Sequence, residues 1–155
     1  DRNGQLLVHI AVLDRDVSSG TIRLMLAANP DSVMAVDNQG STPLHLACQA
    51  GRLDVVKYLV EVNEGTLQIY NSHGECPLHI ACHHGRCDVI NYILEKSDRG
   101  VSVKNAEKRL PIQVILFDAD CDRDSLDFVE AVGRLLFAYP VNPADLIKED
   151  EVDDD

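Results

Sequence analysis

The chain contains no tryptophan, and aromatic residues make up only 5% of its 155 residues. Hydrophobic residues as a whole still reach 45%, so we expect a core built mainly from aliphatic side chains. A hydrophobic share of that size excludes a disordered chain, because such chains contain too little apolar surface to fold. The length suits one ordinary domain or a short array of repeats.

Long hydrophobic runs are missing as well. None approaches the roughly 18–20 apolar residues of a membrane-spanning helix, so we expect no membrane insertion. No signal peptide is visible. The chain begins at Asp1 rather than at a methionine, however, so a targeting signal upstream of it would not be seen.

Positive charge is scarce. The chain has 14 Lys and Arg against 26 Asp and Glu, a formal net charge of −12. An acidic surface repels phosphate backbones, which excludes nucleic acid as a direct partner and favours protein segments that contain Lys or Arg. Catalytic signatures are absent too: we find no phosphate-binding G-x-x-x-x-G-K-[S/T] loop, no G-x-S-x-G elbow and no H-E-x-x-H motif.

Cysteine is present in an odd number, five. We interpret Cys48, Cys76, Cys82, Cys87 and Cys121 as reduced thiols of an intracellular protein, cytoplasmic or nuclear.

A repeated string organises the chain. Thr42-Pro43-Leu44-His45 recurs 34 residues later as Cys76-Pro77-Leu78-His79. A period of this length predicts a solenoid of stacked units, which offers a binding surface rather than a reaction vessel. We divide the chain into units 1–36, 37–70, 71–104 and 105–140, followed by an acidic tail or the start of a degenerate further unit at 141–155.

Each unit predicts a turn, a helix, a short turn, a second helix and a long loop. Asp or Asn opens the first turn and Gly40 or Gly74 closes it, with Lys108 in that place in the last unit. Thr42 is a natural N-cap, and Pro43 suits the first helical position. Gly51 is expected to end the first helix in a left-handed conformation.

The outer units deviate from this pattern. The segment 117–126 in the last unit is about nine residues longer than its counterparts, and its second helix is predicted at 127–138. In the first unit, Leu6, Leu7, Val8 and Ile10 make the first helix apolar on most sides, whereas a terminal cap needs a polar outer face. We therefore expect further repeats before Asp1, or burial of this face against a partner or a second copy.

Two segments resemble ankyrin repeats. Residues 37–60 read DNQGSTPLHLACQAGRLDVVKYLV, and residues 71–94 read NSHGECPLHIACHHGRCDVINYIL. The resemblance implies an all-α solenoid of about four helix–turn–helix units with short β-hairpin turns. It also implies a protein–protein interaction scaffold without catalytic residues, cofactor or metal.

The resemblance further implies partner contacts at the turn tips and along the concave face of the first helices. At the tips these are Arg2, Asn3, Gln5, Asn38, Gln39, Ser41, Ser72, His73, Glu75, Ala106, Glu107 and Arg109, and on the first helices they are Gln49, Ala50, His83 and His84. We expect His83 and His84 to make the affinity for the partner sensitive to pH.

Three alternatives come from local patterns. His79 and His83 have the i, i+4 spacing of zinc ligands, although the resemblance gives His79 a structural role. The Asp-rich loop 118–127 begins like an EF-hand but has Arg123 and Val129 where Gly and Glu belong, which leaves only a weak divalent-cation site. An apolar run before Asp118 and Asp120 resembles the start of haloacid-dehalogenase phosphatases, in which the first Asp is a nucleophile.

A broader alternative concerns the chain's context. Ankyrin arrays often form the regulatory or targeting segment of a larger enzyme or channel, and this is the alternative to a scaffold that acts by itself.

Overall fold

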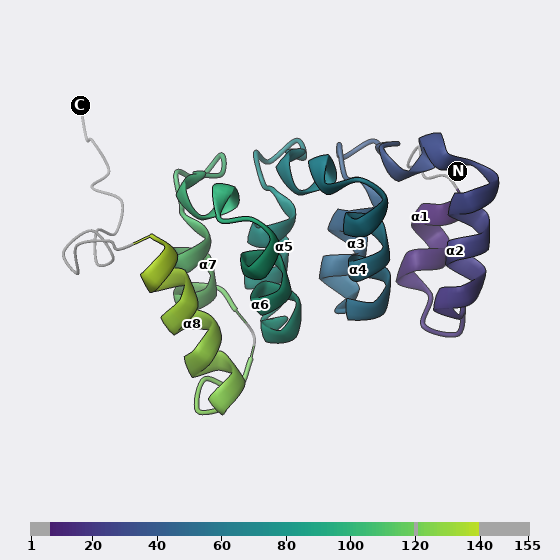
Figure 1. Cartoon of the computed structure of the whole chain (residues 1–155). Coiled ribbons are helices and arrows are strands. Elements are labelled where there is room, and N and C mark those ends of the chain that lie inside the picture. The colour runs from purple at the N-terminus through teal and green to yellow at the C-terminus, as the bar shows by residue number, and fades with distance from the viewer. Residues whose placement is uncertain (1–6, 120, 140–155) are drawn as a thin grey trace.

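A computed structural model describes residues 7–119 and 121–139, and helices are the regular structure of this part (Figure 1). The α-helices are α1 (Leu7–Leu13), α2 (Ser19–Ala28), α3 (Pro43–Ala50), α4 (Leu53–Val62), α5 (Pro77–His83), α6 (Cys87–Lys96), α7 (Pro111–Phe117) and α8 (Leu126–Ala138). The all-α solenoid expected from the sequence is confirmed.

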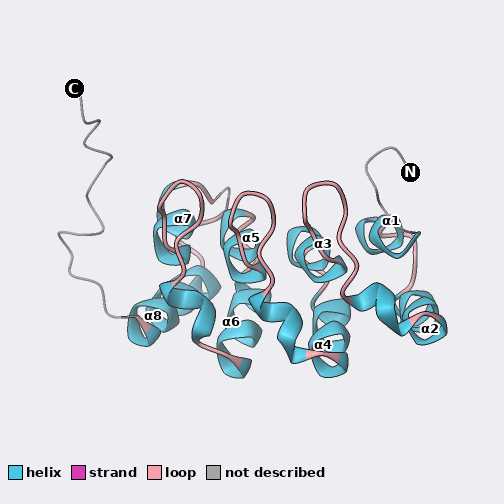
Figure 2. Ribbon diagram, turned by 90° about the horizontal axis from the view of Figure 1, so that it is seen from above, coloured by secondary structure: helices cyan, strands magenta, loops and turns pink. Residues whose placement is uncertain are grey.

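The helices form two parallel rows. Helices α1, α3, α5 and α7 contact one another in that order, and so do α2, α4, α6 and α8. Each helix of the first row also contacts the helix of the second row that follows it in the chain. The array therefore consists of four helix–turn–helix pairs that lie side by side (Figures 1 and 2). Adjacent units thus bury each other's faces, as an array of units too small to fold singly requires.

The core lies between the rows and consists mostly of Leu, Ile, Val, Ala and Cys. Repeat-equivalent positions share the same burial: Leu44, Leu78 and Ile112 are all 2% exposed or less. Cys48 and Cys82 are completely buried, and this burial, followed by the influence of neighbouring cysteines, raises the pKa of both thiols. None of the five cysteines forms a disulfide, as the sequence indicated.

Start and stop signals act where the sequence placed them. Thr42 precedes α3 in an extended conformation, Pro43 is the first helical residue, and Gly51 ends the helix at φ 68°. Asp54 and Asp88 lie in the first turns of α4 and α6, where negative charge is favourable. Helix α8 begins one residue before the predicted start and ends at the predicted Ala138.

The inter-unit loops contain helical turns that we did not predict. They are 3-10 helices η1 (Pro30–Val33), η2 (Glu64–Gln68) and η3 (Arg99–Ser102). Asn63 begins η2 by accepting a hydrogen bond from the Gly65 N–H through its side chain. Such short elements are set by caps rather than by hydrophobic periodicity, so a periodicity argument overlooks them.

The expected β-hairpins are simpler than the resemblance implied. No β-strand occurs within residues 7–119 or 121–139. The turns at 37–41, 71–75 and 105–109 close through one backbone hydrogen bond from the first to the last residue, as in Asn71 N–H to Glu75 O at 3.0 Å. In the same described part, no helix is long and apolar enough to cross a membrane.

Candidate partner-binding surface

Three consecutive turns have the same internal construction. In each, the side-chain oxygen of the opening Asp or Asn accepts hydrogen bonds from two backbone N–H groups of its own turn. Asp37 Oδ1 accepts from Gln39 and Ser41 at 2.9 Å, and Asn105 Oδ1 accepts from Glu107 at 3.1 Å and Arg109 at 3.0 Å. This Asx geometry fixes the direction in which each turn tip points.

The turns are also linked to one another. Ser72 donates to Gln39 O from both its N–H and its hydroxyl, each at 2.8 Å. Ala106 N–H donates to His73 O at 2.8 Å. Neighbouring tips are thereby held at fixed spacing on the same side of the array (Figure 2).

Buried histidines connect helices α3 and α5 to the turns that follow them. His45 Nδ1 accepts from the Thr42 N–H at 3.2 Å, so its proton resides on Nε2, which donates to Glu75 O at 3.1 Å. His79 makes the same pair of bonds with Cys76 and Arg109 O, at 3.4 and 3.2 Å. We call this two-sided contact the histidine brace. It makes the position of each tip depend on the helix before it.

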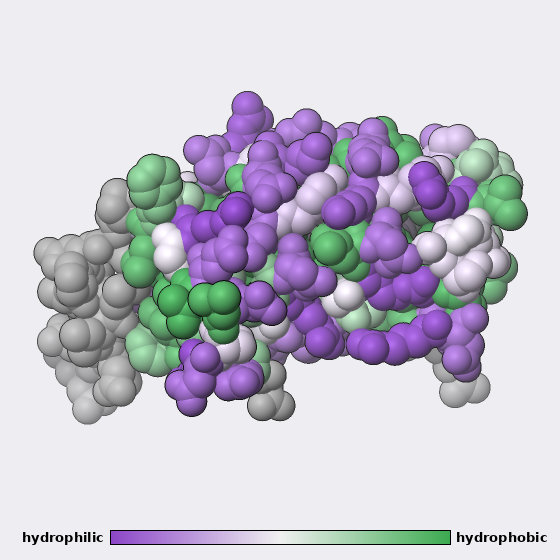
Figure 3. Space-filling model, turned by 60° about the horizontal axis from the view of Figure 1, so that its bottom comes forward, coloured by the Kyte–Doolittle hydropathy of each residue, from purple (hydrophilic) through white to green (hydrophobic). Residues whose placement is uncertain are grey.

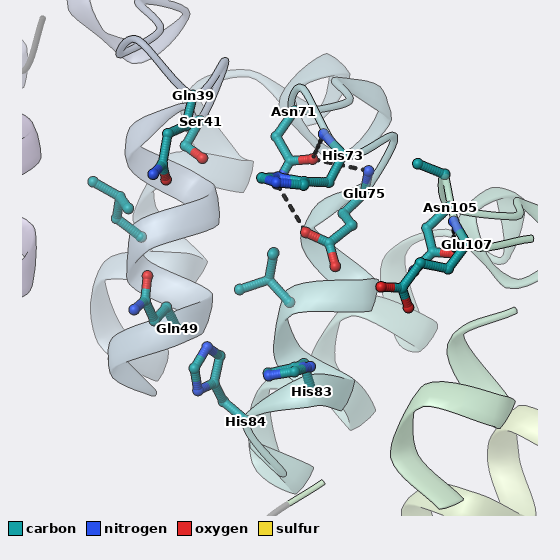
Figure 4. A pocket seen from close by; sticks show the side chains of 13 residues that line it. Gln39, Ser41, Gln49, Asn71, His73, Glu75, His83, His84, Asn105 and Glu107 are labelled. Atoms are coloured by element: carbon teal, nitrogen blue, oxygen red, sulfur yellow. Dashed lines mark hydrogen bonds between the residues drawn. The ribbon is translucent and has the colours of Figure 1, made fainter. Parts of the chain in front are cut away.

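Between these turns and the first helices lies a hollow of about 340 Å³, which we call the central hollow (Figure 4). Its lining residues are Gln39, Ser41, Leu46, Gln49, Asn71, His73, Glu75, Ile80, His83, His84, Asn105, Ala106 and Glu107. Polar side chains form its rim, and Leu46 and Ile80 supply apolar surface between them.

Most of the sequence-predicted contact residues meet in this hollow. Nine of them line it: Gln39, Ser41, Gln49, His73, Glu75, His83, His84, Ala106 and Glu107. Asn38 and Ser72 are exposed at the tips outside it, and Ala50 is half-buried at the end of α3. Arg2, Asn3 and Gln5 lie outside the described residues.

Ser41 differs from the expectation. The residue is only 6% exposed, and its N–H is bound to Asp37 within the turn. Ser41 therefore shapes the wall of the central hollow more than it presents a contact. Its repeat equivalents, Glu75 and Arg109, are larger and half-buried.

Sequence reasoning missed the apolar part of the lining. Leu46 is a core residue that is only 6% exposed, yet it also reaches the hollow. Ile80 occupies the equivalent position 34 residues later and is half-buried. Comparing equivalent positions in the two units would have identified the pair.

A second hollow of about 390 Å³ adjoins the first and shares Glu75, His83 and Glu107 with it. Its own feature is Arg109, whose guanidinium forms an ion pair with Asp118 at the end of α7. The Arg109 Nε also lies 3.7 Å from Glu107 Oε2.

His84 is the residue of this surface with a perturbed pKa. Burial lowers its pKa, and the nearby His83 and Arg86 lower it further, whereas Glu75 opposes them. The rings of His83 and His84 meet edge to face with centroids 5.1 Å apart. Arg86 is itself held by a hydrogen bond to Gln49 O at 3.2 Å, so its charge is fixed beside the hollow.

The comparisons with known proteins agree with this geometry. The sequence model of ankyrin repeats, in three copies, matches residues 2–105. The chain belongs to the ankyrin repeat family. Ankyrin repeats are generally protein–protein interaction modules and typically not catalytic. Among curated proteins, none matches this sequence.

The pair α7 and α8 follows the matched ankyrin segment. It contacts α5 and α6 as those contact α3 and α4, and Gln113 replaces the histidine of the brace by accepting from the Leu110 N–H at 2.9 Å. We propose that it is a fourth ankyrin unit. The unit boundaries remain predictions, and the segment 141–155 lies outside the described residues.

The zinc and phosphatase alternatives find no support in this ankyrin array. The weak cation site stays a prediction, because Asp120 of the loop 118–127 lies outside the described residues. Both ring nitrogens of His79 are engaged in the brace, which leaves no zinc pair with His83. Val114 to Phe117 lie in helix α7, whereas a phosphatase of the type considered needs a strand there. In the part of the chain that is described, no group of three or more His, Cys, Asp and Glu is arranged to hold a metal ion.

Proposed function

We propose that this ankyrin array is a recognition scaffold that binds a partner protein at the central hollow and the adjoining turn tips. The observation that carries the proposal is the central hollow itself, whose rim and apolar lining come from three consecutive turns and two first helices. Hydrogen bonds between neighbouring turns already hold the binding surface in place. Binding therefore requires little further loss of conformational entropy.

The partner segment is proposed to be basic. The chain carries a net charge of −12, and Glu75 and Glu107 are the charged carboxylates of the central hollow. Opposite charge raises association rates more than it raises affinity, and salt screens the effect. We place the protein inside the cell, since its five cysteines are free thiols.

Capture from a cell lysate tests the proposal. An array immobilised through its C-terminus is compared with the variant Gln49→Ala/His83→Ala/His84→Ala and with a control variant, Arg23→Ala/Lys57→Ala/Glu61→Ala, on the row of second helices. We expect a set of proteins that the native array and the control retain and the hollow variant loses. The same set should be released between about 50 and about 300 mM NaCl.

Equal retention by all three arrays would contradict the proposal. Repeating the capture at about pH 5.5 and about pH 7.5 tests the pH sensitivity expected at His83 and His84, because protonation of His84 would add positive charge that opposes a basic segment. Binding that is equally strong at both values would remove that part of the interpretation.

Exposed apolar side chains at both ends of the array support a second candidate. Leu7 and Leu24 on the first unit are more than 70% exposed, and so are Leu126 and Phe137 on α8. On the face of the array shown in Figure 3, hydrophobic surface gathers at the α8 end, whereas the middle is mostly hydrophilic. This pattern favours an array that packs against further repeats, a second copy, or the body of a larger enzyme or channel.

A further inference from the structure

The third and fourth units carry opposite charges at one repeat position. Glu75 and Arg109 are the last residues of their turns and lie 34 residues apart. The backbone carbonyl of each accepts a hydrogen bond from the histidine of the preceding unit. In the fourth unit, the Arg109 guanidinium contacts the Asp118 carboxylate and lies near that of Glu107. This surface therefore already holds one guanidinium between two carboxylates.

The central hollow differs from the Arg109 site, because carboxylates line it without a guanidinium between them. Among its lining residues, Glu75 and Glu107 carry negative charge, and none is Lys or Arg. Asn71 Nδ2 donates to Glu75 Oε2 at 3.0 Å, a neutral contact that aims the carboxylate without neutralising it. Figure 4 shows both carboxylates directed into the space above His83.

Glu107 is only partly compensated by the chain. Arg109 Nε is 3.7 Å from its Oε2, beyond hydrogen-bond range, and the opposite edge of that guanidinium is committed to Asp118. Among the residues that line either hollow, Arg109 is the only Lys or Arg near Glu75. A cation that enters the central hollow thus meets two carboxylates with capacity to accept hydrogen bonds.

The apolar lining suits the rest of a long basic side chain. Leu46 and Ile80 lie between the polar rims contributed by α3 and the turns. Arginine and lysine bury their methylene stems against apolar surface while the charged head stays with polar partners. A volume of about 340 Å³ admits a side chain, not a folded domain.

We propose that the central hollow receives one basic side chain from an extended segment of the partner protein, with Glu75 and Glu107 as its ion partners and Leu46 and Ile80 against its stem. The inference rests on the proposed function and names the chemistry by which the partner is recognised. Arginine fits best, because its planar fork presents several donors to neighbouring carboxylates, and Arg109 stands between Asp118 and Glu107 in the adjoining hollow.

The test uses a defined probe rather than the natural partner. The full chain, labelled with ¹⁵N, is titrated with a blocked five-residue peptide of glycine and alanine that has one central arginine, and separately with the same peptide containing citrulline, which has the shape of arginine without its charge. We expect the arginine peptide to shift the amides of Ile80, His84 and Glu107 with a dissociation constant on the order of 1 mM, and the citrulline peptide to bind at least about fivefold more weakly.

Matched variants locate the site. Glu75→Gln and Glu107→Gln each keep the shape of the side chain. Each should lower the affinity for the arginine peptide by roughly threefold or more, in line with the loss of one exposed charge pair. Glu61→Gln, on the row of second helices, removes the same charge elsewhere and should leave binding unchanged.

Two results would overturn the inference: equal affinity for the arginine and citrulline peptides, or shifts that cluster outside the central hollow. Either result leaves the lysate capture free to succeed, in which case the array recognises its partner through other chemistry. If the lysate capture also shows no dependence on the hollow variants, the proposed function itself fails.

Discussion

At the scale of single residues, the fourth position of each turn is constrained both by its backbone conformation and by the neighbouring turn. Gly40 and Gly74 have positive φ, and Lys108 adopts the same conformation at φ 61°. The difference lies in the neighbouring turn. A Cβ on Gly74 would stand 3.2 Å from Ala106 N, and one on Gly40 would stand 3.1 Å from Ser72 N. Within the described residues no further turn covers Lys108, so its side chain is tolerated there at a cost in backbone energy alone.

We predict that Gly74→Ala destabilises the array by about 1–3 kcal/mol, because alanine is strained at positive φ and its Cβ crowds the next turn. Gly133→Ala provides the matched control. Gly133 lies inside α8 with open space around it, so the same change should stabilise the protein by roughly 0.5–1 kcal/mol. Urea denaturation of both variants measures the difference, and changes of the same sign would contradict the account.

At the scale of elements, the histidine brace determines how one unit is attached to the next. Each brace histidine caps the start of its own helix and donates to the following turn, so a single side chain links two repeats. Burial lowers the pKa of His45 and of His79, with the carbonyls of the next unit opposing the shift. The brace therefore consists of neutral imidazoles in the folded protein.

This has a defined consequence for stability against pH. Because the pKa of both groups is lower in the folded than in the unfolded chain, the unfolded chain takes up protons first as the pH falls. The contribution of the brace is complete above the ordinary histidine pKa of about 6.5 and is lost as the pH falls through the lowered values. We predict a free energy of unfolding that is flat above about pH 7.5 and decreases between about pH 6.5 and pH 5.

The variant His79→Gln isolates this effect. Gln113 shows that glutamine accepts the capping hydrogen bond from the residue at the helix N-cap, so helix α5 keeps its start. The bond to Arg109 O should be lost or lengthened, with a cost of about 1 kcal/mol at neutral pH. Urea midpoints measured across the pH range should fall less steeply for this variant than for the native chain. An unchanged slope would mean that other groups cause the acid sensitivity.

The elements differ in how far the sequence could predict them. Helices α3 to α6 have matching proline, glycine and acidic signals, and their bounds follow from those residues. The 3-10 turns η1 to η3 could not be derived from the hydrophobic pattern, since they depend on side-chain caps such as Asn63. The absence of β-strands in the described turns has a similar cause: a five-residue turn stabilised by an Asx oxygen needs no ladder.

At the scale of the whole molecule, the 34-residue period predicts that the candidate residues share one surface. It does not predict which of them line the same hollow. Gln49 and His84 come from different helices, and Glu107 from a turn after both, yet they line the same hollow. Only the spacing between stacked units brings them together. The burial of Ser41 and the pairing of Arg109 with Asp118 arise within single units, from side-chain packing that the repeat period does not describe, so neither could be derived from the sequence.

The stack also predicts how the molecule unfolds. Each pair of helices contacts only its neighbours along the array, so a lesion at one end should loosen that end, whereas a lesion in the middle removes support from both sides. Ile22 in α2 and Leu78 in α5 are both buried to within 1% exposure and provide comparable lesions. Each change to alanine should cost roughly 2–5 kcal/mol locally.

Amide hydrogen exchange distinguishes the two variants. For Ile22→Ala we expect protection to fall in α1 and α2 while α5 and α6 keep theirs, because the interfaces beyond α3 and α4 are intact. For Leu78→Ala we expect protection to fall from α3 through α8, since the damaged unit contacts both flanks. If Ile22→Ala lowers protection evenly along the chain, the array unfolds as one indivisible domain, and its stability cannot be described as a sum over neighbouring units.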